Sequence, residues 1–305
     1  MGLLRQPHFK PKEVVIMNKK EKASTKIGLF TMFAGPSMIA FTCFVIIPFI
    51  YGLYLTFTSW DGFSSVKQFV GFQNYITVFK DKEFWSSIFL TFRYVIAVVV
   101  LVNLTGFLLA VLLTSHIKGE NFLRAGFFTP NLIGGIVLGF IWQFIFNRVL
   151  VTLPFMPDTS MLSDPTTAFW ALVIVQTWKQ SGYMMLIYIA GLVGVSQDYI
   201  EAARIDGATN RQILWKIRLP LMMQSFTICF FLTLSSAFQV YDLNLSLTNG
   251  GPYGATRMAV MTIFEKAFTY HKYGEGQAEA LVFFLIMLCV AIAQLKFTSK
   301  KEVEA

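Results

Sequence analysis

Two groups of polar side chains stand inside otherwise apolar stretches of this sequence, and their chemistry suits the binding of a polar solute. The first group is Trp178, Lys179, Gln180 and Tyr183, and the second is Gln239, Tyr241, Asp242 and Asn244. An ionised side chain at the centre of a bilayer costs about 2.5–3.5 kcal/mol on insertion scales, so such residues are functional candidates. Amides and charges exchange hydrogen bonds with hydroxyl groups, and aromatic rings cover apolar faces. We expect both groups to line a polar pathway.

The same polar groups have a structural interpretation, because interior amides often serve helix association. Asp242, Glu279 and Arg93 all fall near one end of their apolar stretches, where an ion-pair set between them is the alternative. On straight helices with a rise of about 1.5 Å per residue, Lys179 lies about 10 Å deeper than Asp242. We therefore expect Lys179 to need another partner, a water-filled cavity or a ligand.

Catalytic constellations are absent from the sequence. His8, His116 and His271 are scattered and have no metal-ligand spacing. The three cysteines stand singly in apolar runs and form no disulfide framework. No GxxxxGK[ST] phosphate loop occurs, so the chain holds no nucleotide-binding motif of that kind. We predict that the chain is not an enzyme and carries no cofactor or metal.

The composition indicates a membrane protein. The chain has 305 residues, of which 55% are hydrophobic and 14% are charged, whereas soluble domains carry about 25% charged residues. Six stretches are long enough to cross the hydrocarbon core, which takes about 20 residues. They cover residues 28–57, 89–113, 122–146, 169–195, 221–246 and 279–297. We predict an all-α, polytopic fold with six transmembrane helices.

Basic residues set the expected orientation, because Lys and Arg favour the cytoplasmic side. With the N-terminus inside, they concentrate before span one, in the segments after spans two and four, and after span six. The predicted parts are a cytoplasmic N-terminal tail over 1–26, a transmembrane domain over 27–298 and a cytoplasmic C-terminal tail over 299–305. The net charge of +8 then follows from topology, and we expect no nucleic-acid partner.

A polar segment, EAARIDGATNRQILWKIRLP at residues 201–220, separates spans four and five. Asp198 and Glu201 have the spacing of a capping box. Gly207 suits the left-handed conformation at a helix end. These signals predict a first short helix that stops at Gly207.

A second short helix is predicted to follow at once. Thr209 and Gln212 have the spacing of another capping box, and Pro220 suits the first turn of the next helix. The segment combines small alanines, which let another backbone approach closely, with charges of both signs, which would orient a protein partner. A solvated pair of interfacial helices is the alternative interpretation.

This segment resembles the EAA loop of permeases from binding-protein-dependent ABC importers, with the pattern Glu-Ala-Ala, three residues, Gly, nine residues, Ile-x-Leu-Pro. The matching residues are Glu201, Ala202, Ala203, Gly207, Ile217, Leu219 and Pro220. Most of the chain resembles the carbohydrate-uptake class, and in particular maltose-permease-F-like members. The stretches that carry this are GPSMIAFTCFVIIPFIYGLYLTFTSW, FVGFQNYITVF, TWKQSGYMMLIYIAGL and YDLNLSLTNGGPYGAT. The large extra outer domain and additional spans of the maltose protein itself are missing.

The resemblance implies the transmembrane domain of a type I ABC importer, with cytoplasmic coupling helices at about residues 197–219. The residues expected to couple to the ATPase are Glu201, Ala202, Ala203, Asp206, Gly207, Arg211, Ile217, Leu219 and Pro220. Closure of the ATPase on ATP would then move the transmembrane helices between inward-facing and outward-facing states.

The resemblance also implies the rest of the assembly. The partners would be a second homologous permease, a cytoplasmic ABC ATPase dimer that uses MgATP, and an extracytoplasmic solute-binding protein that contacts the turn at residues 250–253. The solute would be a sugar or oligosaccharide, whose hydroxyls and apolar faces match the two polar groups described first. The expected location is a bacterial or archaeal cell (inner) membrane.

Two other classes of function remain as alternatives. An autonomous secondary transporter or channel for a small polar solute would need an ion-coupling site and, commonly, inverted repeats. An integral membrane enzyme would need paired catalytic groups at a membrane face. The sequence shows none of these features, and the permease interpretation is preferred.

Overall fold

A computed structural model describes residues 23–115, 117–154 and 158–300 of the chain. Most of the predicted N-terminal tail, together with His8 and His116, lies outside these residues. Within them every regular element is helical, and the backbone forms a single isolated bridge between Thr58 and Phe69. The fold class is all-α, as predicted.

The chain divides into two compact units, residues 1–52 and 53–305. In the first unit, α1 (Ala23–Phe41) continues through the turn η1 (Thr42–Ile46) into α2 (Ile47–Leu55). Gly28–Leu55 is apolar and long enough to cross a membrane, which confirms the first predicted span. Its large side chains are exposed, for example Phe33 and Phe44, as expected of a helix that faces lipid or another chain.

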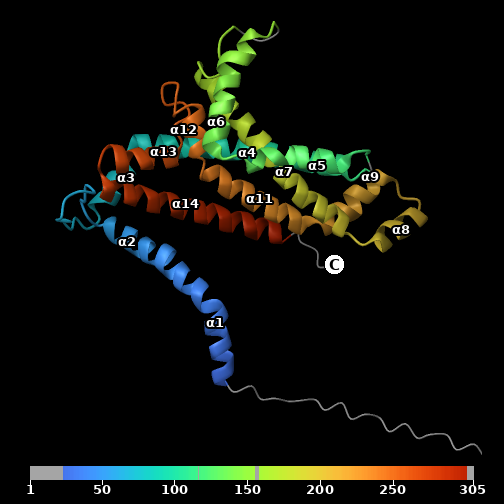
Figure 1. The fold of residues 1–305 in the computed structure, drawn as a ribbon, viewed down its shortest axis with the longest axis horizontal. Coiled ribbons are helices and arrows are strands. Elements are labelled where there is room, and N and C mark those ends of the chain that lie inside the picture. Colours follow the sequence, from blue (N-terminus) through green and yellow to red (C-terminus); the bar gives the residue numbers. More distant parts are fainter. Residues whose placement is uncertain (1–22, 116, 155–157, 301–305) are drawn as a thin grey trace, which may run out of the picture. The chain divides into compact units, whose positions relative to one another are not determined.

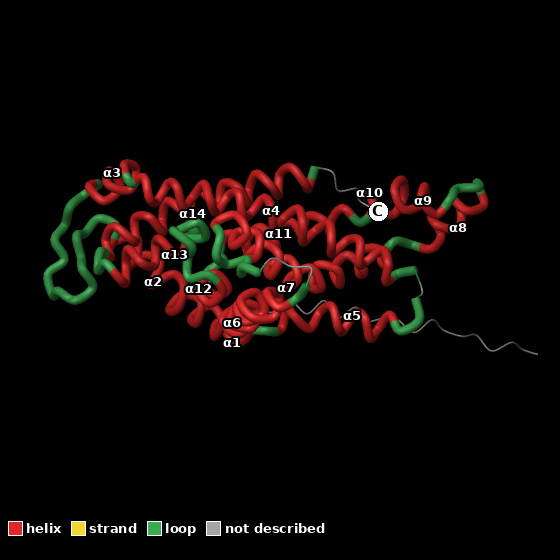
Figure 2. Tube along the Cα trace, turned by 90° about the horizontal axis from the view of Figure 1, so that it is seen from above, coloured by secondary structure: helices red, strands yellow, loops and turns green. Residues whose placement is uncertain are grey.

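Four long helices of the second unit lie side by side (Figure 1, Figure 2). They are α4 (Lys82–Leu113), α7 (Pro165–Gly194), α11 (Met223–Phe238) and α14 (Tyr273–Ser299). Helix α4 packs along α7, and α11 packs against both α4 and α14. Aspartates define where α4 and α7 begin, because the Asp81 and Asp164 carboxylates accept hydrogen bonds from backbone N–H groups of the first turn.

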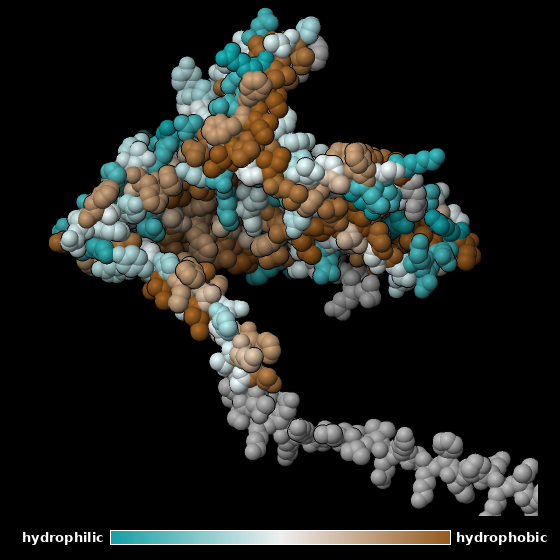
Figure 3. Space-filling view, viewed as in Figure 1, coloured by the Kyte–Doolittle hydropathy of each residue, from teal (hydrophilic) through white to brown (hydrophobic). Residues whose placement is uncertain are grey.

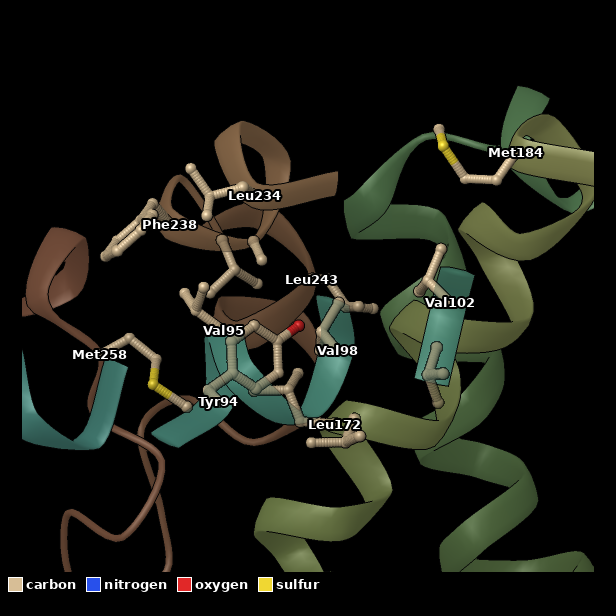
Figure 4. Close-up of a cluster of buried hydrophobic side chains, with 14 of the residues drawn as sticks. Tyr94, Val95, Val98, Val102, Leu172, Met184, Leu234, Phe238, Leu243 and Met258 are labelled. Carbon is tan, nitrogen blue, oxygen red and sulfur yellow. The ribbon is translucent and has the colours of Figure 1, made fainter. Parts of the chain in front are cut away.

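The core of this bundle lies where α4 meets α7 and α11. Tyr94, Val98 and Val102 of α4 point towards side chains of the neighbouring helices (Figure 4). Lipid tails are as apolar as these side chains, so close packing and interhelical hydrogen bonds hold such helices together. One buried hydrogen bond runs from the Tyr188 hydroxyl to Asn103 Oδ1 at 2.7 Å.

The third predicted span, 122–146, is wrong as a single helix. The chain instead forms α5 (Glu120–Phe128), the turn η2 (Thr129–Leu132) and then α6 (Gly135–Phe144). The break comes at Pro130, which has no backbone N–H to donate. Helix α5 lies along α7, whereas α6 leaves the bundle at a steep angle (Figure 1). The apolar stretch that could span a membrane here is Gly135–Thr152.

The fifth predicted span, 221–246, is also broken. Helix α11 ends at Phe238, and α12 (Asp242–Leu247) begins after a short non-helical segment. Helix α12 packs against α6, and a Cβ atom on Gly139 would come within 1.9 Å of Ser246 Oγ. The break therefore accompanies a close contact between α12 and α6.

Ion pairs connect the N-terminal ends of α4 and α14. Between these helices lie α13 (Ala259–Phe264) and η6 (Glu265–Thr269). Lys266 Nζ pairs with Asp81 at the start of α4 and lies 2.9 Å from Glu279 Oε1 of α14. Burial works against the ionised Asp81 carboxylate, but hydrogen bonds from Lys266 and from backbone N–H groups lower its pKa below the usual range.

Short helices complete the second unit. Helix α3 (Gln73–Lys80) precedes α4, and its Asn74 amide donates to the carbonyls of Thr56 and Thr58. Four helices are long and apolar enough to cross a membrane, and two bent pairs bring the number to six. In these pairs α7 bends by 62° into α8, and α11 follows its preceding segment at 67°. The chain is therefore a polytopic membrane protein.

Candidate functional site

The segment between α7 and α11 folds into the predicted helical hairpin, which we call the hairpin (residues 197–221). It consists of α8 (Gln197–Ile205), α9 (Asn210–Ile213), the turn η5 (Leu214–Arg218) and α10 (Leu219–Leu221). The hairpin lies at the end of the bundle opposite α3 (Figure 1, Figure 2), where hydrophilic surface gathers (Figure 3). The middle of the molecule is covered by apolar surface (Figure 3).

Local signals set the shape of the hairpin largely as predicted. Gly207 has φ +80°, the left-handed conformation expected at the end of α8. Thr209 and Gln212 form the reciprocal capping box of α9. The predicted cap at Asp198 is wrong, because α8 begins earlier and Ser196 Oγ accepts the hydrogen bond from the Asp198 N–H. Asp198 instead lies in the first turn, where its negative charge faces the positive end of the helix dipole.

A small apolar cluster holds the hairpin together. Val195, Ile200 and Ile213 are buried in it, and Ala203 and Ala208 pack against them. These two alanines therefore allow the helices of the hairpin itself to approach closely.

Most of the predicted coupling residues remain at the surface of the hairpin. Ile205, at the tip, is 86% exposed, an unusual position for a large apolar side chain. Glu201, Ala202, Asp206, Gly207 and Arg211 are exposed, and Ile217, Leu219 and Pro220 are half-buried. The hairpin therefore presents an apolar tip surrounded by charges of both signs. Such a surface is suited to binding another protein.

Four of the eight predicted pathway residues meet in one cavity, which we call the Lys179 pocket. It has a volume of about 200 Å³ and lies where α6, α7 and α11 meet the break before α12. Lys179 comes from α7, and Gln239, Tyr241 and Asp242 come from the break. The pocket therefore combines a cation, a carboxylate, an amide and a phenol.

The predicted separation of Lys179 from Asp242 is wrong. The estimate of about 10 Å assumed that span five is a continuous helix, and the break at residues 239–241 places Asp242 in the same pocket as Lys179. Among the residues that the structure describes, Lys179 forms no ion pair. Its ammonium group is therefore available to a ligand or to water in the pocket.

The other four predicted pathway residues lie outside the pocket. Gln180 is buried and accepts a hydrogen bond from Gln176 at 3.2 Å, and the ring of Trp178 lies 5.4 Å from that of Trp142. The Tyr183 ring packs near Phe128. Asn244 is wholly buried and donates to the Thr256 carbonyl at 2.7 Å, so its contacts fix the turn after α12.

The alternative ion-pair set of Asp242, Glu279 and Arg93 does not form. Glu279 pairs with Lys266, and the Arg93 guanidinium lies over the Phe169 ring at 5.6 Å. Sequence reasoning missed Lys266 as the partner, because it lies in a segment expected to be an outer loop. It also missed Ser236, which lines the Lys179 pocket and accepts a hydrogen bond from Gln176 at 3.3 Å. In the sequence, the only indication of a role for Ser236 is a hydroxyl group within an otherwise apolar helix.

Among the described residues, no group of three or more His, Cys, Asp or Glu side chains comes together in a way that could hold a metal ion.

Known proteins resemble this chain over nearly its whole length. The chain is 40% identical over 292 residues to the probable starch degradation products transport system permease protein AmyD of Thermoanaerobacterium thermosulfurigenes, covering 94% of this chain and all of that protein. It is 31% identical to the trehalose/maltose transport system permease protein MalF of Thermococcus litoralis, covering 92% of this chain and 96% of that one.

Solved structures show the same fold. A chain of a bacterial ABC transporter involved in the import of the acidic polysaccharide alginate superposes with a TM-score of 0.78 at 18% identity, covering 91% of this chain and 96% of that chain. Residues 102–301, which include the Lys179 pocket and the hairpin, match the family of binding-protein-dependent transport system inner membrane components. The chain belongs to that family, the permeases of ABC importers.

Proposed function

We propose that this chain is a permease subunit of an ATP-driven importer and forms, with a second homologous permease, the pathway for a sugar or oligosaccharide. Relatives support the solute class, since they are named for the transport of starch degradation products, of multiple sugars and of trehalose and maltose. The observation that carries the proposal is the Lys179 pocket inside a family that transports solutes.

The Lys179 pocket has the chemistry that a sugar requires. Lys179 donates hydrogen bonds, Asp242 accepts them and Gln239 does both. The Tyr241 ring packs against Phe264 at 5.1 Å and offers an apolar face to the C–H groups of a sugar. At about 200 Å³ the pocket would engage part of the solute, and the second permease would complete the pathway.

Energy for import would come from another chain. We propose that the hairpin docks on a cytoplasmic ABC ATPase dimer that hydrolyses MgATP, while this chain holds no cofactor. The exposed tip at Ile205 would enter the ATPase, and the exposed charges of Glu201 and Asp206 would orient the two proteins. ATP-driven closure would then shift the permease between inward-facing and outward-facing states, whose balance the ligands control. Both termini would then lie in the cytoplasm of a bacterial or archaeal cell.

The opposite side would receive the loaded solute-binding protein. The turn at residues 249–254 carries Tyr253, which is 98% exposed and has φ +53°. A rigid turn that presents an exposed aromatic side chain is suited to protein recognition. We propose that the solute-binding protein contacts Tyr253 when it delivers the solute.

Reconstitution tests this function directly. The chain, its second permease, the ATPase and the solute-binding protein are placed in liposomes, and uptake of radiolabelled sugar is measured with and without ATP. Lys179→Met should lower uptake by about tenfold or more, as expected for the loss of a charge-assisted hydrogen bond, without loss of ATPase binding. Arg93→Met, which removes a span cation outside the pocket, is the matched control.

Two results would overturn the proposal. Uptake by this chain alone without ATP would indicate an autonomous transporter or channel. Equal uptake by Lys179→Met and Arg93→Met would show that the Lys179 pocket is not part of the transport pathway. The ligand bound by the purified solute-binding protein identifies the solute.

A further inference from the structure

A second cavity lies at the base of the hairpin, and its charges are all of one sign. Its volume is about 490 Å³, and its walls come from the ends of α4 and α7 and from the hairpin. Arg204 of α8, Arg211 of α9 and Arg218 of η5 all line it, and no acidic residue does. We call this cavity the arginine pocket.

The three guanidinium groups have no counter-charge within the described part of the chain. None of them forms an ion pair there, and Arg218 Nε is buried without a hydrogen-bond partner. Like charges around one cavity repel each other, and a buried donor without a partner is costly. Arg204 and Arg211 are exposed and Arg218 is half-buried, so the pocket gathers positive charge around one buried donor that an anion would satisfy.

The polar surroundings do not compete with the arginines for that anion. The hydroxyls of Thr114 and Ser115 donate to backbone carbonyls of their own helix at 2.9 Å each. The negative end of α4 is offset by Arg124, which donates to the Leu113 carbonyl at 3.0 Å. The N–H groups of the three arginines thus remain as the donors, and guanidinium groups bind phosphate through paired hydrogen bonds.

The position and the apolar walls favour a phosphate that belongs to a lipid. Helix α4 has 32 residues, so at about 1.5 Å per residue it exceeds a hydrocarbon core of about 30 Å. The arginine pocket at its C-terminal end therefore lies near the level of the headgroups. Val111 and Leu192 add apolar wall, and nearby Trp215 is 57% exposed, as is common for tryptophan at membrane interfaces.

We propose that the arginine pocket binds the phosphate group of an anionic phospholipid from the cytoplasmic leaflet. This inference rests on the membrane orientation proposed above. The lipid would neutralise the three arginines and join the hairpin to the ends of α4 and α7.

Lipid titration of the purified full-length chain in detergent tests the proposal. Phosphatidylglycerol and phosphatidylcholine are added in parallel, and bound lipid is counted by native mass spectrometry while the melting midpoint is recorded. Phosphatidylglycerol should bind and raise the midpoint, and phosphatidylcholine should not. The double variant Arg204→Gln/Arg218→Gln should weaken phosphatidylglycerol binding by about tenfold or more, because it removes charge-assisted hydrogen bonds.

Matched variants distinguish a specific lipid-binding site from a general effect of positive charge. Lys118→Gln/Lys216→Gln makes the same change in net charge outside the pocket and should retain lipid binding. Arg204→Lys/Arg218→Lys keeps the charge but removes the paired donors, so it should bind phosphatidylglycerol more weakly than the unaltered chain. This lysine variant also provides the test if the glutamine variant fails to fold.

Four outcomes would overturn the proposal. Equal binding of the two lipids, or unchanged binding by the folded lysine and glutamine variants, would show that the pocket holds no anionic lipid. Displacement of the lipid by equimolar inorganic phosphate would assign the pocket to a free anion. Loss of ATPase co-purification with lipid binding intact would assign the arginines to the ATPase. Loss of lipid binding with the ATPase retained would support the lipid and leave the proposed transport function untouched.

Discussion

At the scale of single residues, the charges in this chain fall into paired and unpaired sets with different roles. Lys266 is held between Asp81 and Glu279, and its side chain is only 12% exposed. Lys179 has no such partner and lines a cavity. A buried charge with its counter-ions fixes structure, whereas a cation left available inside an apolar domain points to a ligand.

Removing the paired lysine should destabilise the protein. Lys266→Met leaves two carboxylates without their cation, which costs about 3–5 kcal/mol for a buried pair. The melting midpoint of the purified chain should fall clearly. Lys272→Met is the control, because Lys272 pairs with Glu275 at the surface with its side chain 56% exposed, and such pairs contribute about 0–1 kcal/mol. Equal midpoints for the two variants would contradict this role.

The same ion pair predicts how stability depends on pH. The pKa of Asp81 is lower in the folded chain, despite burial, because Lys266 and backbone N–H groups bond its carboxylate. Its contribution is therefore complete above the unfolded pKa of about 3.9 and is lost as the pH falls through the folded pKa. The melting midpoint should decline below about pH 4, and less steeply in Asp81→Asn. An identical acid decline in both proteins would contradict the prediction.

At the scale of elements, helix breaks and glycines decide which segments touch. Helix α5 lies so close to α7 that a Cβ atom on Gly182 would come within 1.9 Å of the Phe127 carbonyl oxygen. Helix α6 meets α12 in a similar way at Gly139. The first contact joins the first half of the broken span three to α7, and the second joins the second half of span three to the end of the broken span five.

Adding one methyl group at this helix contact should be harmful. Gly182→Ala would force α5 and α7 apart, because the clashing atom belongs to the backbone and cannot rotate away. We expect a loss of about 1–3 kcal/mol, the usual cost of overpacking, seen as a lower melting midpoint. Gly126→Ala is the control on α5, where a Cβ would meet nothing within 4 Å. A Gly182→Ala protein as stable as this control would exclude the close packing.

The turn of the hairpin offers a test of coupling that is separate from folding. Gly207 has φ +80° and open space around it, so strain rather than a clash limits what can replace it. Gly207→Asn should be tolerated, since asparagine adopts this conformation most readily among the other residues. Gly207→Val should distort the turn, and Glu201→Lys should reverse a charge on an intact turn. We expect both to lower ATPase co-purification. Normal ATPase ratios in both variants would oppose docking by the hairpin.

At the scale of the whole molecule, the two candidate sites lie in different regions. The hairpin forms one end of the bundle, and the Lys179 pocket lies where α6 and α12 meet α7 (Figure 1). Both are connected through α7, which lines the pocket at Lys179 and runs on to the hairpin. We therefore expect a movement of the hairpin to reach the pocket along α7.

Membrane orientation can be checked by cysteine labelling. The exposed Cys43 and Cys289 are first replaced by serine, and the buried Cys229 is kept. In this background Asp206→Cys at the hairpin should react with an impermeant maleimide only in inside-out vesicles. Tyr253→Cys should react only in right-side-out vesicles. The opposite pattern would invert the proposed topology.

The sequence alone determined the class of fold, the approximate spans and the hairpin. Apolar length is a property of each segment, so α4, α7 and α14 are recognised without knowing their neighbours. The caps at Thr209 and the turn at Gly207 likewise depend on residues only a few positions apart. The EAA pattern indicated the family for the same reason, because it is a local arrangement of fixed spacing.

The tertiary structure alone decided which distant residues meet. Spans three and five are each long enough and apolar enough to be predicted as one helix, and their breaks accompany Pro130 and the packing of α12 against α6. Those breaks place Asp242 in the same pocket as Lys179. Asn244 instead stabilises the turn after α12 through its hydrogen bond to the Thr256 carbonyl. Pairing of Lys266 with Glu279, and the gathering of three arginines at one cavity, also depend on helix packing. Contacts between segments far apart in the chain depend on the joint geometry of several helices, which no single local pattern contains.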